Sequence, residues 1–210
     1  MRIGTLEALR RYPIKSLRGE ALERVTVETS GIPGDRGDAL FARDGARAGK
    51  TYRGKENDRL HLVADAAAAE VTAGERSDIV ELRHGEHFFD DAPISILVDV
   101  WMRELDRHVG YSVEWERFRP NLFVRAGEAG APAEEALIGA ELTLGSVRLR
   151  VRSPIERCVT ITYHPKGEAS DPRILRFLAQ ERRAWLGIYC DVLEPGRARL
   201  GDALARLDPK

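Results

Sequence analysis

The chain has 210 residues, with 33 lysines and arginines against 34 aspartates and glutamates, and a formal net charge of −1. This length allows one large domain or two small ones around a real hydrophobic core. The balanced charge lacks the basic excess typical of nucleic-acid binders, so we expect no nucleic-acid partner. No apolar run approaches the roughly 20 residues that cross a bilayer, and the N-terminus lacks an apolar signal segment. We therefore expect a cytoplasmic protein without a membrane partner.

The two cysteines, Cys158 and Cys190, lie too far apart to form a Cys-x-x-Cys pair. They match neither a zinc pattern nor a disulfide framework, and they are too few to hold an iron–sulfur cluster by four thiolates. Cys190 stands beside apolar residues in strand register, so we interpret it as a core residue. Cys158 needs a closer look.

In the first half of the chain, short strands alternate with turns rich in glycine and proline. The pattern predicts strands over 3–9, 22–28, 39–42 and 60–63, an alanine-rich helix over 65–75, and a hairpin of 79–82 with 86–89. Residues 43–59 are polar, dotted with glycine and without periodicity. A loop this long within a compact domain is usually functional or mobile.

The second half continues with strands and adds two helices. One helix is expected to start at Asp99 as N-cap and to end near Gly110, and another to start at Ser170-Asp171-Pro172. Strands are predicted over 94–98, 114–117, 122–125, 141–144, 147–151 and 188–193, with a last short strand after Gly201-Asp202. The fold class is thus α+β and strand-rich, with barrels and two or three short helices.

The segment 153–162 is predicted to be a strand with an unusual face. Since side chains alternate along a strand, a thiol and two hydroxyls would share the side opposite the apolar residues: Cys158, Thr160 and Thr162. A bare cysteine is often a small structural hydrophobe. Here its polar neighbours leave a reactive or metal-binding thiol equally open.

Three loops offer groups that bind anions: Lys15-Ser16, Asp35-Arg36 and Arg119-Pro120-Asn121. The planar fork of arginine suits phosphate, while lysine and serine supply a point charge and a hydroxyl donor. Each loop alone is also consistent with a solvated charge beside a turn.

Five motifs, in this order and spacing, resemble those of the MOSC family, named after the C-terminal domain of molybdenum cofactor sulfurases: Tyr12-Pro13-Ile14-Lys15-Ser16, Gly34-Asp35-Arg36, Arg117-Phe118-Arg119-Pro120-Asn121, Arg157-Cys158 and Gly201-Asp202. The resemblance covers nearly the whole chain. It implies an N-terminal β-barrel module over residues 1–92 and a MOSC-type β-barrel domain over residues 93–210.

The resemblance further implies a molybdenum cofactor, a pterin whose dithiolene holds the metal. In the amidoxime-reducing relatives the cysteine of the Arg-Cys motif ligates molybdenum, and this cysteine maps onto Cys158; a soft thiolate suits such a metal. The positions matching those that hold pterin and phosphate are Lys15, Ser16, Arg36, Arg119 and Asn121, with Thr160 and Thr162 as further donors. An Asp-x-x-Pro segment near the metal maps onto Asp90, as a catalytic residue, with Pro93. Asp91 remains an alternative, as does a turn or cap role for the aspartate.

The chain also departs from these relatives. Where many of them have Asp-Pro-x-Thr-Gly, it has His164-Pro165-Lys166-Gly167, so substrate preference does not transfer. His164 is either a new proton donor or a solvated loop histidine. Arg157 is expected to point away from Cys158 on a regular strand.

The resulting hypothesis is an oxidoreductase that reduces N-oxygenated small molecules of the hydroxylamine or amidoxime type. The chain has no cysteine set for an iron–sulfur centre and no Gly-x-Gly-x-x-Gly fingerprint, so electrons are expected from a separate partner protein. One alternative is a sulfur carrier or cofactor-handling protein with a persulfide on Cys158, and another is a MOSC-like binding domain without the cofactor. Geometrically, we expect Cys158 and Thr162 to face one cavity shared with Lys15, Arg36 and Arg119.

Overall fold

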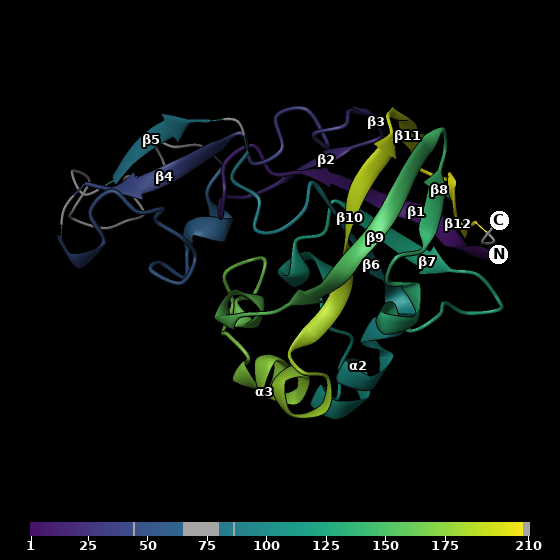
Figure 1. Cartoon of the computed structure of the whole chain (residues 1–210). Coiled ribbons are helices and arrows are strands. Elements are labelled where there is room, and N and C mark those ends of the chain that lie inside the picture. Colours follow the sequence, from purple (N-terminus) through teal and green to yellow (C-terminus); the bar gives the residue numbers. More distant parts are fainter. Residues whose placement is uncertain (44, 65–79, 86, 208–210) are drawn as a thin grey trace.

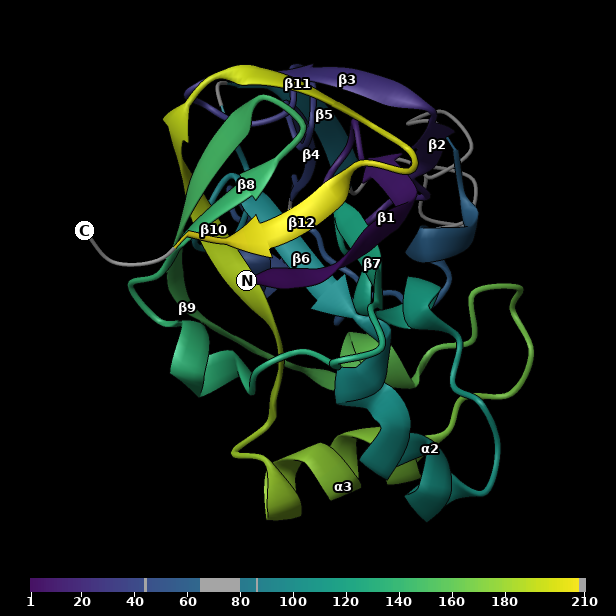
Figure 2. The ribbon, with the colours of Figure 1, turned by 90° about the vertical axis from the view of Figure 1, so that its right-hand side faces the viewer.

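The computed structural model describes residues 1–43, 45–64, 80–85 and 87–207. Seven antiparallel and parallel strands close into a barrel (Figures 1 and 2). In spatial order they are β12 (Ala203–Arg206), β8 (Glu141–Leu144), β9 (Val147–Glu156), β10 (Trp185–Glu194), β6 (Ile94–Val98), β7 (Leu122–Ala126) and β1 (Arg2–Arg11), and β1 then pairs with β12. The strand-rich α+β prediction with a MOSC-type barrel is confirmed.

Within the described residues, five further strands lie outside the barrel. They are β2 (Glu20–Leu22), paired with β1; β3 (Arg24–Val27), paired with β11 (Gly196–Arg199); and β4 (Asp38–Ala42), paired with β5 (Val80–His84). The β4–β5 ribbon stands to one side of the barrel in Figure 1.

Two α-helices, α2 (Arg103–Val109) and α3 (Pro172–Glu181), lie together at one end of the barrel (Figure 1). Six short 3₁₀ helices complete the described elements: η1 (Gly45–Arg47), η2 (Leu60–Leu62), η3 (Asp99–Met102), η4 (Trp115–Phe118), η5 (Glu134–Leu137) and η6 (Val159–Thr162). Among the described residues, no helix is both long and apolar enough to span a membrane.

The core fills the barrel and the space beneath the two helices. Every residue of β6 is buried, because β6 lies between β10 and β7 and is covered on both faces. Along β9 the buried residues Val147, Leu149 and Val151 alternate with more exposed ones, as expected for a strand with one face in the core. A second, smaller cluster of Ile14, Leu17, Leu40, Leu60 and Val63 supports the β4–β5 side.

The first strand belongs to the barrel that the rest of the chain builds. β1 pairs with β7 from Gly4 to Leu9 and with β12 from Arg2 to Thr5. The segment directly after β1 therefore leaves the barrel wall and carries the Tyr12-Pro13-Ile14-Lys15-Ser16 motif. The predicted domain boundary near residue 92 falls between β5 and β6, and it stays a prediction.

Several local predictions are confirmed. Asp171 caps α3 by accepting a hydrogen bond from Arg173 N at 3.0 Å, with Pro172 in the first turn. Gly110 ends α2 with φ 88°, and β8 and β9 form the expected hairpin, with Leu144 paired to Val147.

The predicted cap at Asp99 is wrong. Asp99 does not cap an α-helix: it begins η3, and its Oδ1 accepts hydrogen bonds from Val100 N and Ala126 N.

Other local predictions are wrong. Residues 114–117 do not form a strand, because Glu114 and Arg117 pair across the turn of η4 at 2.6 Å. β5 pairs with β4 and not with residues 87–89. The helix expected over 65–75, and residues 79 and 86 of the predicted hairpin, lie outside the described residues.

The predicted strand over 153–162 is also wrong in its second half. β9 ends at Glu156, and Cys158 stands as N-cap of η6. The chain turns here because the η6 backbone bonds locally, with Ile161 N donating to Cys158 O at 3.2 Å and Tyr163 N donating to Thr160 O at 3.3 Å. The two-residue alternation on which the sequence argument relied therefore stops just before the thiol.

The close approach of Gly4 in β1 to the neighbouring strand β7 allows the closure of the barrel to be tested by substitution. A Cβ on Gly4 would lie 2.2 Å from the backbone oxygen of Arg125 in the paired strand β7, whereas a Cβ on Gly127 would meet Ile3 O at 3.9 Å. We expect Gly4→Ala to lower the free energy of unfolding by about 1–3 kcal/mol, because backbone cannot move aside cheaply. Gly127→Ala, the control, should stay within about 0.5 kcal/mol. Urea unfolding measures both, and equal stability of the two variants would contradict this account of the closure.

Candidate functional site

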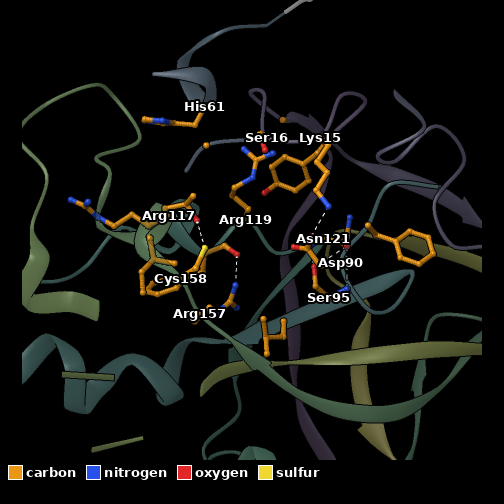
Figure 3. Close-up of a pocket in the computed structure, with 18 of the residues that line it drawn as sticks. Lys15, Ser16, His61, Asp90, Ser95, Arg117, Arg119, Asn121, Arg157 and Cys158 are labelled. Atoms are coloured by element: carbon orange, nitrogen blue, oxygen red, sulfur yellow. Dashed lines mark hydrogen bonds and ion pairs between the residues drawn. The ribbon is translucent and has the colours of Figure 1, made fainter. Parts of the chain in front are cut away.

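A cavity of about 850 Å³ opens beside the barrel, where loops from both halves of the chain meet (Figure 3). Its walls come from the segment after β1, from Arg36, from the 53–61 loop, and from the segments around Asp90, Arg119 and Cys158. Ten lysines and arginines line it against four aspartates and glutamates. A chain with a net charge of −1 thus concentrates positive charge in one concave site, which raises the local concentration of anions.

Three residues of the cavity wall hold a left-handed backbone conformation. Ser16, Arg36 and Arg119 have φ values of 70°, 49° and 51°, and they are three of the five non-glycine residues with positive φ in the described chain. Such conformations cost free energy and persist where the surrounding structure imposes them, often at ligand sites. All three were predicted from the sequence to bind the cofactor.

Tyr12 is the platform on which two of these arginines rest. The guanidinium carbons of Arg36 and Arg119 lie 4.7 and 4.3 Å from its ring centroid. Tyr12 is buried, its hydroxyl donates to Pro120 O at 3.1 Å, and its backbone N–H donates to Asp35 Oδ1 at 2.7 Å. Burial raises its pKa, so the ring stays neutral and its face attracts the cations. From the sequence, Tyr12 was only part of a motif, and this role was not predicted.

Arg36 and Arg119 differ in how many hydrogen-bond and ion-pair partners the protein gives their guanidinium groups. Arg36 is ion-paired with the buried Asp35 and donates from Nη2 to Arg119 O at 3.3 Å. Arg119 has no carboxylate partner, and its buried Nη2 has no hydrogen-bond partner among the described residues. Burial, reinforced by the neighbouring Arg36, lowers the pKa of Arg119 to about 10. A bound anion would supply the missing acceptor, so this side chain fits an anionic cofactor.

Lys15 and Asp90 form an ion pair at the cavity wall, 2.6 Å between Nζ and Oδ1 (Figure 3). The Asp90 side chain is 74% exposed. Partial desolvation by the surrounding protein acts to raise the pKa of Asp90, but Lys15, with Arg36 and Arg119 nearby, holds this pKa below its ordinary value. Asp91 instead accepts a hydrogen bond from Ser153 Oγ at 3.1 Å. Asp90, and not Asp91, is therefore the aspartate that interacts with the predicted cofactor-binding lysine.

Asn121 lines the cavity but is bound into the fold. Its Oδ1 accepts from Ser95 Oγ at 2.8 Å and Ser95 N at 3.1 Å, and its Nδ2 donates to Arg10 O at 3.3 Å. These bonds fix the start of β7 against β6 and so hold the preceding Arg119 in place. Ser95 is a contributor that the sequence argument did not identify.

Cys158 faces the cavity and is half-buried (Figure 3). Its Sγ lies 3.2 Å from Thr160 Oγ1, so the predicted neighbourhood of thiol and hydroxyl exists although the strand does not. Cys190 is fully buried in the core, as predicted, and burial raises its pKa. The two thiols therefore differ sharply in access.

Arg157 lines the same cavity, contrary to the prediction that it points away from the thiol. The expectation assumed a regular strand, which ends at Glu156. Its Nε donates to Leu186 O at 2.7 Å and its Nη1 to Phe118 O at 2.8 Å, while the buried Nη2 has no partner among the described residues. Burial lowers its pKa to about 10. Like Arg119, Arg157 thus has a buried guanidinium nitrogen with no partner among the described residues, although it was not predicted as a site residue.

Thr162 does not share the cavity with Cys158, so this prediction is wrong. The turn of η6 points its hydroxyl at Val159 O, 2.8 Å away, and its carbonyl accepts from Arg117 Nη1 at 2.9 Å. Thr160, two residues earlier, does line the cavity.

His164 fits neither of its two expected roles. It is buried and not solvated, and it does not line the cavity. Its Nε2 lies 3.2 Å from Glu114 Oε1, and its carbonyl accepts from His61 Nε2 at 2.8 Å. His61, which the sequence argument did not single out, lines the cavity (Figure 3) and stacks on Tyr163 with 5.9 Å between ring centroids.

Comparison with solved structures supports the fold. The crystal structure of the YuaD protein from Bacillus subtilis matches with a TM-score of 0.58 and 19% identity, covering 96% of this chain and 93% of that one. A hypothetical protein matches with a TM-score of 0.52 and 14% identity, over 100% of this chain and 70% of that one. YiiM from Escherichia coli gives 0.47 and 15%, over 96% and 71%. At these identities the likeness to the first two structures shows the fold alone. Comparison with curated proteins found no match.

Family models account for nearly the whole chain. The model of the MOSC N-terminal beta barrel domain matches residues 3–91, and the model of the MOSC domain matches residues 83–205. The two matches meet where the segment carrying Asp90 enters the cavity. The chain therefore belongs to the MOSC family, with a MOSC domain preceded by a MOSC N-terminal beta barrel domain.

Proposed function

We propose that the cavity binds a molybdenum cofactor and that the protein is an oxidoreductase that reduces N-oxygenated compounds of the hydroxylamine or amidoxime type. The observation that carries this proposal is the position of one accessible thiol, Cys158, in a cavity also lined by Arg119 and Arg157. Each of these arginines has a buried guanidinium nitrogen with no hydrogen-bond partner among the described residues. An anionic pterin phosphate would complete those donors, and a thiolate is a fitting ligand for a soft metal centre.

Different residues would bind different parts of the cofactor. The cationic loop residues Lys15, Ser16, Arg36 and Arg119 would bind its phosphate and pterin, while Asn121 keeps Arg119 in place. Cys158 would ligate the metal, and Thr160, at 3.2 Å from its sulfur, would hydrogen-bond to the same sulfur or to the cofactor. When bound, the cofactor supplies two-electron redox chemistry at the metal.

Arg157 and Asp90 would set the charge around the reacting group. Arg157 is cationic at neutral pH, since even its lowered pKa is about 10, and it adds positive charge to the cavity wall beside Cys158. Asp90, with its lowered pKa, is ionised at neutral pH. It therefore acts as an acceptor, and it would orient an N–H or O–H group of the substrate.

Electrons would come from a separate donor protein, because two cysteines cannot hold an iron–sulfur cluster by four thiolates. We expect the purified protein with a nicotinamide donor alone to show no turnover of an amidoxime. Product formation measured by chromatography under these conditions would contradict the need for a partner.

A sulfur-carrier function remains the second candidate, supported by the same accessible thiol. A persulfide on Cys158 would lie among the same hydroxyl and cationic groups, and it needs no metal. The two functions differ in what the purified protein carries.

The cofactor content of the purified protein distinguishes the reductase from the sulfur carrier. Protein made in a host that synthesises the cofactor should contain about one molybdenum and one pterin per chain, by elemental analysis and pterin fluorescence. Arg119→Gln should lower both at least about tenfold, because the phosphate loses its buried partner. Arg103→Gln, an exposed change on α2, should not. Absence of metal together with a labile sulfur on Cys158 by mass spectrometry would favour the sulfur carrier instead.

Alkylation tests the role of Cys158 without any turnover. In cofactor-free folded protein, iodoacetamide should modify Cys158 and leave Cys190, which is fully buried and has a raised pKa. In the loaded protein Cys158 should be protected at least about tenfold, because a metal-bound thiolate is not free to react. Peptide mass spectrometry reads both sites. Equal modification of Cys158 with and without the cofactor would rule out its role as a ligand.

A further inference from the structure

We propose that Lys55 and Lys166 form an anion-binding entrance to the cavity, so that its preferred small-molecule ligands carry a carboxylate or phosphate group. One consequence rests on the proposed function: if the protein is a reductase, its substrates would be anionic hydroxylamines or amidoximes. The entrance itself can be tested without that function.

The two lysines lie on loops that pack against each other beside the thiol. A Cβ on Gly54, next to Lys55, would lie 3.0 Å from the Thr160 methyl, and a Cβ on Gly167, next to Lys166, would lie 2.9 Å from a Leu62 methyl. The hydrogen bond from His61 to His164 O, at 2.8 Å, joins the same two loops. Because Thr160 contacts Cys158, this wall of the cavity borders the reacting position.

These lysines differ from the cavity cations that carboxylates hold in place. Arg53 is held by Glu56 at 3.0 Å and Lys15 by Asp90 at 2.6 Å. Lys55 and Lys166 line the cavity and are exposed, and neither side chain makes an ion pair or hydrogen bond with any described residue. Their charge is therefore available to a ligand.

Their position also separates them from the predicted cofactor loops. Lys15, Ser16, Arg36 and Arg119 come from segments grouped around Tyr12, whereas Lys55 and Lys166 belong to the wall formed with Thr160 and Tyr163. With the first group engaged by the cofactor, the second would meet the substrate. Two ammonium groups at a partly enclosed site favour a negatively charged group over a neutral one of the same shape.

The charge at this entrance can be measured with two alkylating reagents of similar size. In cofactor-free protein carrying Cys190→Ser, the rate of Cys158 modification by anionic iodoacetate is divided by the rate with neutral iodoacetamide. The Lys55→Gln/Lys166→Gln variant should lower this rate ratio at least about threefold at low salt. High salt should bring the ratios of the unaltered protein and the variant closer together, because salt screens the lysine charges. Lys50→Gln, which removes a lysine outside the cavity, should leave the ratio unchanged. An unchanged ratio in the double variant would overturn the proposal.

Equilibrium binding then tests the ligand class in the loaded protein. Benzamidoxime is compared with its 4-carboxylate and 4-phosphonate derivatives by fluorescence titration, since Trp185 lines the cavity. We expect the anionic derivatives to bind at least about fivefold more tightly and the double lysine variant to lose this preference. Equal affinities in the unaltered protein would overturn the proposal. Preferential binding without turnover would leave the entrance in place and contradict only the reductase function.

Discussion

Arg119 and Arg157 are half-buried arginines, each with one buried guanidinium nitrogen that has no hydrogen-bond partner among the described residues, and the site is organised around them. An unsatisfied buried donor costs free energy, and a buried cation costs more. The fold offsets this with the Tyr12 ring under Arg119 and with the carbonyls of Phe118 and Leu186 on Arg157. Both side chains line the cavity, so their positive charge favours an anion bound there.

Much of this could be predicted from the sequence because it depends on local chemistry. Turn residues and alternation gave most of the barrel strands, the Asp171 cap and the Gly110 helix end. The motif residues Lys15, Arg36 and Arg119 lie on separate loops, and their residue types alone indicated an anion. The structure brings these three to one cavity with Cys158.

What the sequence could not show depends on a change of backbone geometry and on contacts distant along the chain. The end of β9 at Glu156 moved Thr162 away from the cavity and brought Arg157 into it, and no pattern within the segment marks that change. The hydrogen bond between His61 and His164 joins residues 103 positions apart. The role of Tyr12 likewise needs the positions of two distant arginines, because a ring becomes a platform only when cations lie on it.

The closure of the barrel through β1 has a consequence for the order in which the site is assembled. β1 completes its pairing only when β12, near the other end of the chain, is available. The other end of β1, next to Tyr12, pairs with β2 and β7, which precede β12 in the chain. On the ribosome the N-terminal strand must wait for the last strand of the barrel, which makes the pairing highly non-local. Because the cavity takes lining residues from Tyr12 to Tyr189, its ligand can be bound only after most of the chain has been synthesised.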